Sequence, residues 1–478
     1  MNRLLYFYEA PEPTTWIFLS SFLLLSIFFV FHRVFSIRNL DVVLLLFLSP
    51  GLLMVYEGRR MKWEDLPSVP TEQLAAAATS VGFKNSTRYI VHQPTVQSGD
   101  SSQSSEDLGY PPKEVEAPIW NAESLQFYGF AVLLLACAFL TIRMMIDPAL
   151  VRRPLLIPNL SIGGLGFIGV CLFVFLASIV VTSTPREQEI RGPHLGPGYE
   201  FLNMLPQLPM TPPVAAQESK VPEAEPDQYA RLLPILARAI AVFSNLAIVL
   251  SIVGVGYWHF DNVKTGIGCA VMYLLLPYTA QMTGNLEHVA PAALMSLALL
   301  AYRQPLLSGV LMGLAAGLVY YPLFLLPLWI SFYWKRGLAM WLTGALLALL
   351  LLVSMLLLQG WQEFLDHLSR MFGIWLPRME GLEGIWGPNR IQPDYRLPVL
   401  VGFILLSASY AIWPSRKNLG TLMSGTAVVM LAAQFWHGYG GGLYMAWFLP
   451  FTLLTVFRPN LDDRIATAVV KAPRPKPA

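Results

Sequence analysis

The strongest constraint on this chain is a series of apolar runs, each roughly 17 to 29 residues long and bounded by charged or turn residues. An α-helix needs about 20 apolar residues to cross the hydrocarbon core of a bilayer, so the sequence predicts an all-α polytopic membrane protein of about 12 or 13 spans. The hydrophobic share of 55% and the charged share of 13% agree with this class. The runs are 15–32, 39–56, 124–146, 161–183, 231–257, 265–282, 286–302, 305–333, 338–359, 397–414, 419–436 and 441–457.

Three polar segments interrupt these runs: 57–123, 184–230 and 360–396. The first is rich in Ser, Asp, Gly and Pro, which predicts partial flexibility. The second is dense in proline and carboxylates, and we expect it to run extended over a surface. The third begins with an amphipathic helical pattern and continues with Trp, Arg and Glu.

Lysine and arginine in the short connections indicate the orientation, because they favour the cytoplasmic side. This rule predicts that the three polar segments face outward and that Arg303 and Lys335 lie on the same side. The run 305–333 between them must then enter the membrane, break near Pro322 and return. We expect an N-terminal membrane region (1–160), a transmembrane core (161–457) and a basic cytoplasmic tail (458–478), in a multi-pass protein of a bacterial cytoplasmic membrane.

Several kinds of chemistry find no support in the sequence. The net charge of +2 gives no indication of a nucleic-acid partner. Cys137, Cys171 and Cys269 all lie inside apolar runs, which predicts small buried hydrophobic residues and no metal cluster or disulfide framework. No Walker A, GxGxxG, HExxH, CxxC or GxSxG motif is present, so we expect no metal and no cofactor.

The stretch 284–336 reads GNLEHVAPAALMSLALLAYRQPLLSGVLMGLAAGLVYYPLFLLPLWISFYWKR. Its polar GN turn, GLAA helix, Tyr-Pro break, LLPL continuation and basic end resemble the core of GT-C type glycosyltransferases. It is most similar to family 87, the polyprenyl-phosphate-mannose-dependent mannosyltransferase-like proteins, over roughly 230–380. The resemblance implies a GT-C-like helical bundle with outward loops. It also implies a hexosyltransferase that moves a sugar from a polyprenyl-phosphate donor to a glycan or lipid acceptor, with a carboxylate of an outer loop as base.

The residues that this chemistry would use lie in the outer segments, because a base and a phosphate-binding cation are both needed near a lipid-lined groove. In the turn GNLEH, Asn285, Glu287 and His288 stand at the end of an apolar run, where ionisable groups are often functional. Val319 occupies the position where family members often carry a lysine. The candidate bases are Glu64, Asp65, Glu187, Glu189 and Glu200. The candidate donor-binding residues are Asn285, His288, Tyr320, Tyr321, Arg378, Arg390, Arg396 and His437.

Two other functions stay open at this stage. The same scaffold could bind or transport lipid or glycan without chemistry, although acids are scarce within the apolar runs. Residues 1–160 could serve as a structural region that binds partners through the outer segment. A lipid-facing groove beside Tyr320 and Tyr321, with a carboxylate at its mouth, would favour the enzyme.

Overall fold

The computed structural model describes the greater part of the chain. The described residues are 13–64, 121–150, 156–183, 185, 195–208, 228–334, 337–358, 360–372, 382–387, 390–415 and 417–459.

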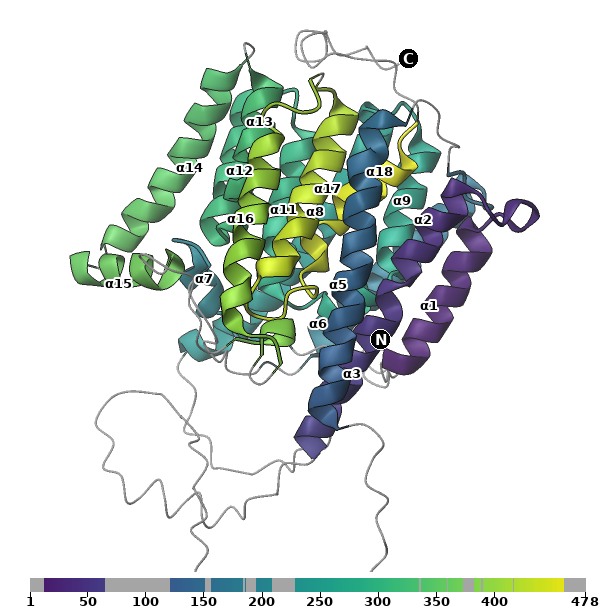
Figure 1. Cartoon of the computed structure of the whole chain (residues 1–478), viewed down its shortest axis with the longest axis horizontal. Helices are drawn as coiled ribbons and strands as arrows, with labels where there is room; N and C mark the ends of the chain where they lie inside the picture. The colour runs from purple at the N-terminus through teal and green to yellow at the C-terminus, as the bar shows by residue number, and fades with distance from the viewer. Residues whose placement is uncertain are drawn as a thin grey trace, which may run out of the picture.

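These residues form an almost entirely helical bundle (Figure 1). The α-helices are α1 (Pro13–Phe28), α2 (Ile37–Leu46), α3 (Leu48–Glu64), α5 (Ala122–Ile146), α6 (Ile162–Thr182), α7 (Tyr199–Asn203), α8 (Gln228–Trp258), α9 (Val263–Leu275), α10 (Pro277–Met282), α11 (Leu286–Leu300), α12 (Pro305–Leu318), α13 (Leu326–Tyr333), α14 (Leu338–Leu358), α15 (Trp361–Phe372), α16 (Arg396–Ser409), α17 (Leu419–Trp436) and α18 (Leu449–Phe457). Short 3₁₀ turns include η2 (Asp147–Ala149), η3 (Tyr321–Leu325), η4 (Gly384–Trp386) and η6 (Met445–Trp447).

The bundle has the character of an integral membrane protein. Among the described residues, six helical stretches are long and apolar enough to span a bilayer: Ile37–Met61, Ala122–Ala149, Ile162–Thr182, Leu232–Trp258, Leu338–Leu358 and Leu419–Trp436. Further apolar helices are shorter and lie between breaks. Outward side chains such as Phe167 and Leu350 are apolar and exposed, as a lipid-facing surface requires. The predicted all-α polytopic class is therefore confirmed.

The run 305–333 enters the bundle, breaks and returns. Helix α12 ends at Leu318, η3 begins one residue before Pro322, and α13 leads back to the end of the bundle where α12 began. The phenol of Tyr333 donates to the backbone carbonyl of Tyr302 at 2.7 Å, which brings the two flanks of the run together. The predicted break and return of this run are thus correct, while Lys335 itself lies outside the described residues. Pro322 marks the break because its ring cannot continue an α-helix.

Small residues bring α12 and α14 into close contact. A Cβ atom added at Gly309 or Gly313 would overlap backbone atoms of α14, and one added at Gly344 would overlap the carbonyl of Leu306. At Gly317 the Leu352 side chain occupies the space that a Cβ would need. Such close approach is the usual way for helices to associate in lipid, where the hydrophobic effect between them is weak.

A buried ion-pair network closes the end of the bundle opposite α7 and α15. Arg143 of α5 binds Asp41 of α2 through two N–H donors, at 2.7 and 2.9 Å. Asp147, which is fully buried, accepts from Arg143 at 3.4 Å and from Arg458 at 2.7 Å. Each charge has an opposite partner, as burial in a membrane bundle requires. The network ties the N-terminal helices to the residue that follows α18.

The structure differs from the sequence prediction in the first two polar segments and at one cysteine. Helix α3 continues to Glu64, and the first proline after the apolar run, Pro67, comes three residues later. Residues 195–208, which we expected on the surface, insert into the bundle because their side chains include the buried Leu195, Tyr199 and Leu202. Cys171 is exposed on α6, whereas Cys137 and Cys269 are buried as expected.

Candidate functional site

The most chemically distinctive place among the described residues surrounds Glu287, in the first turn of α11. One carboxylate oxygen accepts a hydrogen bond from the phenol of Tyr199 at 2.8 Å. The other lies 3.6 Å from Nε2 of His288. The Glu287 side chain keeps 27% of its surface exposed, whereas His288 is almost fully buried. A carboxylate held from two sides and still accessible can accept a proton from a bound hydroxyl group.

Residues 195–208 bring Tyr199 to this carboxylate. The amide of Gly198 donates to the carbonyl of Gly317 at 2.8 Å, and the carbonyl of Leu195 accepts from the amide of Tyr320. A Cβ atom at Gly196 would overlap the backbone at the end of α12, so only glycine permits this approach. The segment is therefore hydrogen-bonded to the break between α12 and η3, and α7 places Tyr199 next to Glu287.

Six aromatic rings form a continuous stack beside the carboxylate, from Tyr278 of α10 to Tyr320. Neighbouring ring centroids lie 6.2, 4.2, 4.2, 4.9 and 4.5 Å apart, in the order Tyr278, His288, Tyr444, His437, Tyr321 and Tyr320. All six rings are buried. We call this set the aromatic column. It joins the break at Pro322 to the turn that carries Glu287, and it fixes the ring of His288 against the carboxylate.

A hydrogen bond from Tyr278 fixes His288 further, because the Tyr278 hydroxyl lies 2.8 Å from Nδ1. When this hydroxyl donates to Nδ1, the remaining ring proton is on Nε2, which faces Glu287. The indole of Trp447 also donates to the backbone carbonyl of Glu287, at 3.2 Å. The carboxylate is thus positioned by groups from four different segments of the chain.

The turn after α17 forms the next wall of the site. Arg396 donates to the carbonyl of Trp436 through Nε and Nη2, at 3.2 and 3.0 Å. The amide of Glu383 donates to the carbonyl of Gly438 at 2.8 Å, which pairs the backbone at Glu383 with Tyr439. Burial lowers the pKa of His437 well below its ordinary value, and His288 and Arg396 lower it further. His437 is therefore a neutral ring within the aromatic column.

Charged groups of both signs act on Tyr444, which lies at the centre of the site. Burial raises the pKa of its phenol well above the ordinary value, and the carboxylates of Glu287 and Glu383 raise it further. Arg59, which is exposed near the end of α3, lowers this pKa. The site therefore combines a partly exposed carboxylate with a buried phenol that stays protonated.

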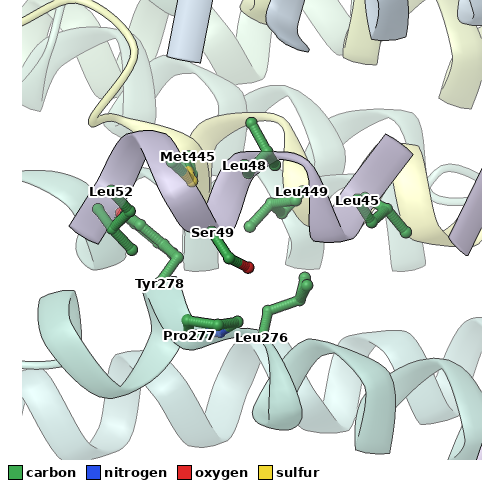
Figure 2. Close-up of a pocket in the computed structure, with 9 residues that line it drawn as sticks. All are labelled: Leu45, Leu48, Ser49, Leu52, Leu276, Pro277, Tyr278, Met445 and Leu449. Carbon is green, nitrogen blue, oxygen red and sulfur yellow. The ribbon is translucent and has the colours of Figure 1, made fainter. Parts of the chain in front are cut away.

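An apolar cavity lies behind the aromatic column (Figure 2). Its volume is about 10 Å³, roughly the space that one water molecule needs, and it lies between α2, α3, the start of α10 and the residues from η6 to α18. Tyr278 is one of its walls and also the partner of His288. Figure 2 shows the hydroxyl of Ser49 pointing between Leu276 and Pro277. A space of this size cannot hold a lipid chain, so it is a packing gap beside the polar site.

The structure brings together several residues that the sequence singled out, and separates others. His288, Tyr320, Tyr321 and His437 all belong to the aromatic column, and Arg396 braces the turn beside it. The Asn285 amide contacts the sulfur of Met282 at 3.2 Å. Arg390 lies elsewhere, with Nη2 bonded to Ser124 Oγ at 3.0 Å and its guanidinium over Phe127.

Of the candidate bases, the structure describes Glu200 and Glu64. Glu200 lies on α7, with Oε1 at 3.3 Å from Nδ1 of His367. Glu64 is the last residue of α3. The other candidates, Asp65, Glu187, Glu189 and Arg378, lie outside the described residues.

Three tyrosines and the role of Glu287 were missing from the candidate list. Tyr199, Tyr278 and Tyr444 come from three segments that the sequence does not connect. Glu287 stands next to His288 in the turn GNLEH, so its position gave a signal, but only Tyr199 distinguishes it from a solvated acid. Within the described part of the chain, no group of three or more His, Cys, Asp or Glu side chains converges as metal ligands would.

Comparisons with protein-family models, with curated proteins and with solved structures find no match for this chain. The geometry of the site is therefore the basis for the functional conclusion.

Proposed function

We propose that this chain is an integral membrane glycosyltransferase that transfers a sugar from a polyprenyl-phosphate-linked donor to a glycan or lipid acceptor. The observation that carries the proposal is the Glu287 carboxylate, accessible at the end of the bundle and oriented by Tyr199 and His288. The proposed location is the outer face of a bacterial cytoplasmic membrane. It is supported by the distance of this site from the end that carries Arg143 and Arg458.

In the proposed reaction the acceptor hydroxyl attacks the anomeric carbon of the donor sugar. Glu287 takes the hydroxyl proton, the new glycosidic bond forms, and the bond to the phosphate oxygen breaks with its electron pair remaining on the phosphate. A cation must stabilise the departing phosphate, and Arg59, which is exposed near the end of α3, is the proposed one.

The test is transfer of radiolabelled sugar from a panel of polyprenyl-phosphate hexoses to lipid and glycan extracts, with the protein in nanodiscs. Replacing a general base removes about 10²–10⁴-fold of the rate, so Glu287→Gln should reduce transfer by that factor. The matched control is Glu123→Gln, which changes an exposed carboxylate in the first turn of α5. Transfer by Glu287→Gln at the wild-type rate, or no transfer by the wild type from any donor, would overturn the proposal.

The second candidate is a protein that binds a lipid or glycan on the same scaffold without chemistry. It is favoured by the complete burial of His437 and by the bonds of Arg396 to a backbone carbonyl, which leave these two groups little freedom to contact a substrate. Saturable binding of a polyprenyl-phosphate sugar that is never consumed, and that Glu287→Gln leaves unchanged, would select this function.

A further inference from the structure

Helix α15 lies across the end of the bundle, unlike the spanning helices. Figure 1 shows it at the lower end of α14, steeply inclined to α14 and next to α7. The corner between α14 and α15 is made at Gly360, whose φ of +135° is a conformation that side chains rarely adopt. Because α14 is one of the six stretches long enough to span a bilayer, α15 begins where that span reaches the membrane boundary.

Helix α15 presents three different faces. Trp361, Leu365 and Leu368 are exposed by 65%, 45% and 38%, and their spacing places them on one side of the helix. Asp366 is exposed on the opposite side, about 160° around the axis from Leu368 at 100° per residue. His367 lies on the flank between these sides and is almost completely buried.

The apolar face continues the lipid-facing surface of α14. Leu357 and Leu358, the last residues of α14, are exposed by 38% and 87%, and Trp361 follows only three residues later. The segment 361–372 carries two carboxylates and one arginine, so anionic headgroups would give no net attraction. Insertion of apolar side chains is therefore the interaction that fits this face, and a bilayer surface is the partner of matching chemistry.

His367 connects this helix to the segment that carries Tyr199. Its Nε2 lies 2.8 Å from the carbonyl of Gly196, and its Nδ1 lies 3.3 Å from Glu200 of α7. Residues 195–208 are in turn clasped to the end of α12. A change in the depth of α15 would thus move the residues that hold Tyr199.

We propose that α15 is an interfacial helix that inserts Trp361, Leu365 and Leu368 at the boundary between headgroups and acyl chains, and that His367 holds residues 195–208 at that depth. The proposal concerns the placement of the protein in the bilayer and does not depend on glycosyl transfer. An amphipathic helix of this kind lies in the plane of the membrane, with its apolar face about 5–10 Å below the surface.

The first experiment places a fluorophore on each side of α15 in the full-length protein. Leu368→Cys and Asp366→Cys are made in a Cys171→Ala background, because Cys137 and Cys269 are buried. Both variants are labelled with an environment-sensitive dye and reconstituted in nanodiscs with either shallow doxyl lipids or aqueous iodide. We expect doxyl lipid to quench the Leu368→Cys label several-fold more than the Asp366→Cys label, and iodide to show the reverse order.

Two results would overturn the interfacial placement. Equal quenching of both labels by iodide would mean that α15 lies in water. Protection of the Leu368→Cys label from both quenchers would mean that protein, such as a second copy of the chain, covers this face.

The second experiment tests His367 by hydrogen exchange. His367→Ala should accelerate exchange of the amides in residues 195–208 by about tenfold or more, and His367→Gln should restore protection because its amide can still donate to the Gly196 carbonyl. Amides of α17 serve as the internal reference. Unchanged exchange in 195–208 for His367→Ala would show that His367 does not hold this segment.

Discussion

Gly129 of α5 lies directly against the backbone of α3, and this contact leads to a stability prediction. A Cβ atom at Gly129 would lie 2.8 Å from the amide nitrogen of Val55 and 3.0 Å from the carbonyl oxygen of Gly51. Ordinary contacts of a Cβ atom begin at 3.4 Å. Since both neighbours are backbone atoms, Gly129→Ala can be accommodated only by separating α3 and α5 by roughly half an ångström.

The expected cost follows from the packing of this helix pair. Overpacking a well-packed interior costs about 1–3 kcal/mol. Alanine also gains about 1 kcal/mol of helix propensity over glycine, so a control must include that gain. Gly163→Ala provides it, because Gly163 is also helical and a Cβ atom there meets nothing within 4 Å. The difference between the two variants isolates the packing cost.

The buried thiol of Cys137, two turns further along α5, reports on the separation of the helices. In a Cys171→Ala background, its modification by a maleimide under native conditions measures how often α5 opens. A cost of about 1–3 kcal/mol predicts labelling about 5 to 150 times faster in Gly129→Ala than in Gly163→Ala. Cys269 of α9 is the internal reference and should be labelled at the same rate in both variants.

Equal labelling of Cys137 in Gly129→Ala and Gly163→Ala would refute this reasoning. It would mean that α3 and α5 yield at this contact without measurable cost. Faster labelling of Cys137 and Cys269 together would also contradict it, because the effect would then not be confined to the pair of helices that meet at Gly129.

Two further predictions concern charged residues at the end of the bundle opposite α7 and α15. Asp147→Asn removes the buried carboxylate that pairs with Arg458, while Arg143 keeps Asp41, and it should destabilise the protein by about 3–5 kcal/mol. Thermal unfolding should separate it clearly from Asp261→Asn, which changes an exposed acid. Burial lowers the pKa of Lys417, in the connection between α16 and α17, from 10.5 to about 8. The folded state then binds fewer protons than the unfolded state between these values, so stability should rise from pH 8 to 10.5, and Lys417→Met should flatten this slope in unfolding titrations.

The sequence predicted the helical bundle well because apolar length alone determines which segments can enter a membrane. The break at Pro322 was also predictable, since Arg303 and Lys335 had to lie on one side. The insertion of residues 195–208 was not, because its buried leucines are scattered among prolines and polar residues in a segment that has no periodic pattern.

The sequence indicated single residues of the site but not how they are arranged. His288, His437 and Tyr321 each stood out from their apolar surroundings, but their stacking depends on how α11, η3 and the turn after α17 pack together. Acids are frequent in the polar segments, so the sequence pointed to candidate bases there. Glu287 lies at the end of an apolar run, and Tyr199, which orients it, is 88 residues away in the chain.

The buried ion pairs also set an order for the assembly of this protein during synthesis. Asp41 and Arg143 are both present once the first third of the chain has been made, so their pair can form early. Asp147 acquires its second partner only when Arg458 emerges, 311 residues later. Nascent chains that stop before α18 would carry a half-neutralised aspartate inside the membrane, a state that quality-control proteases of the membrane could recognise.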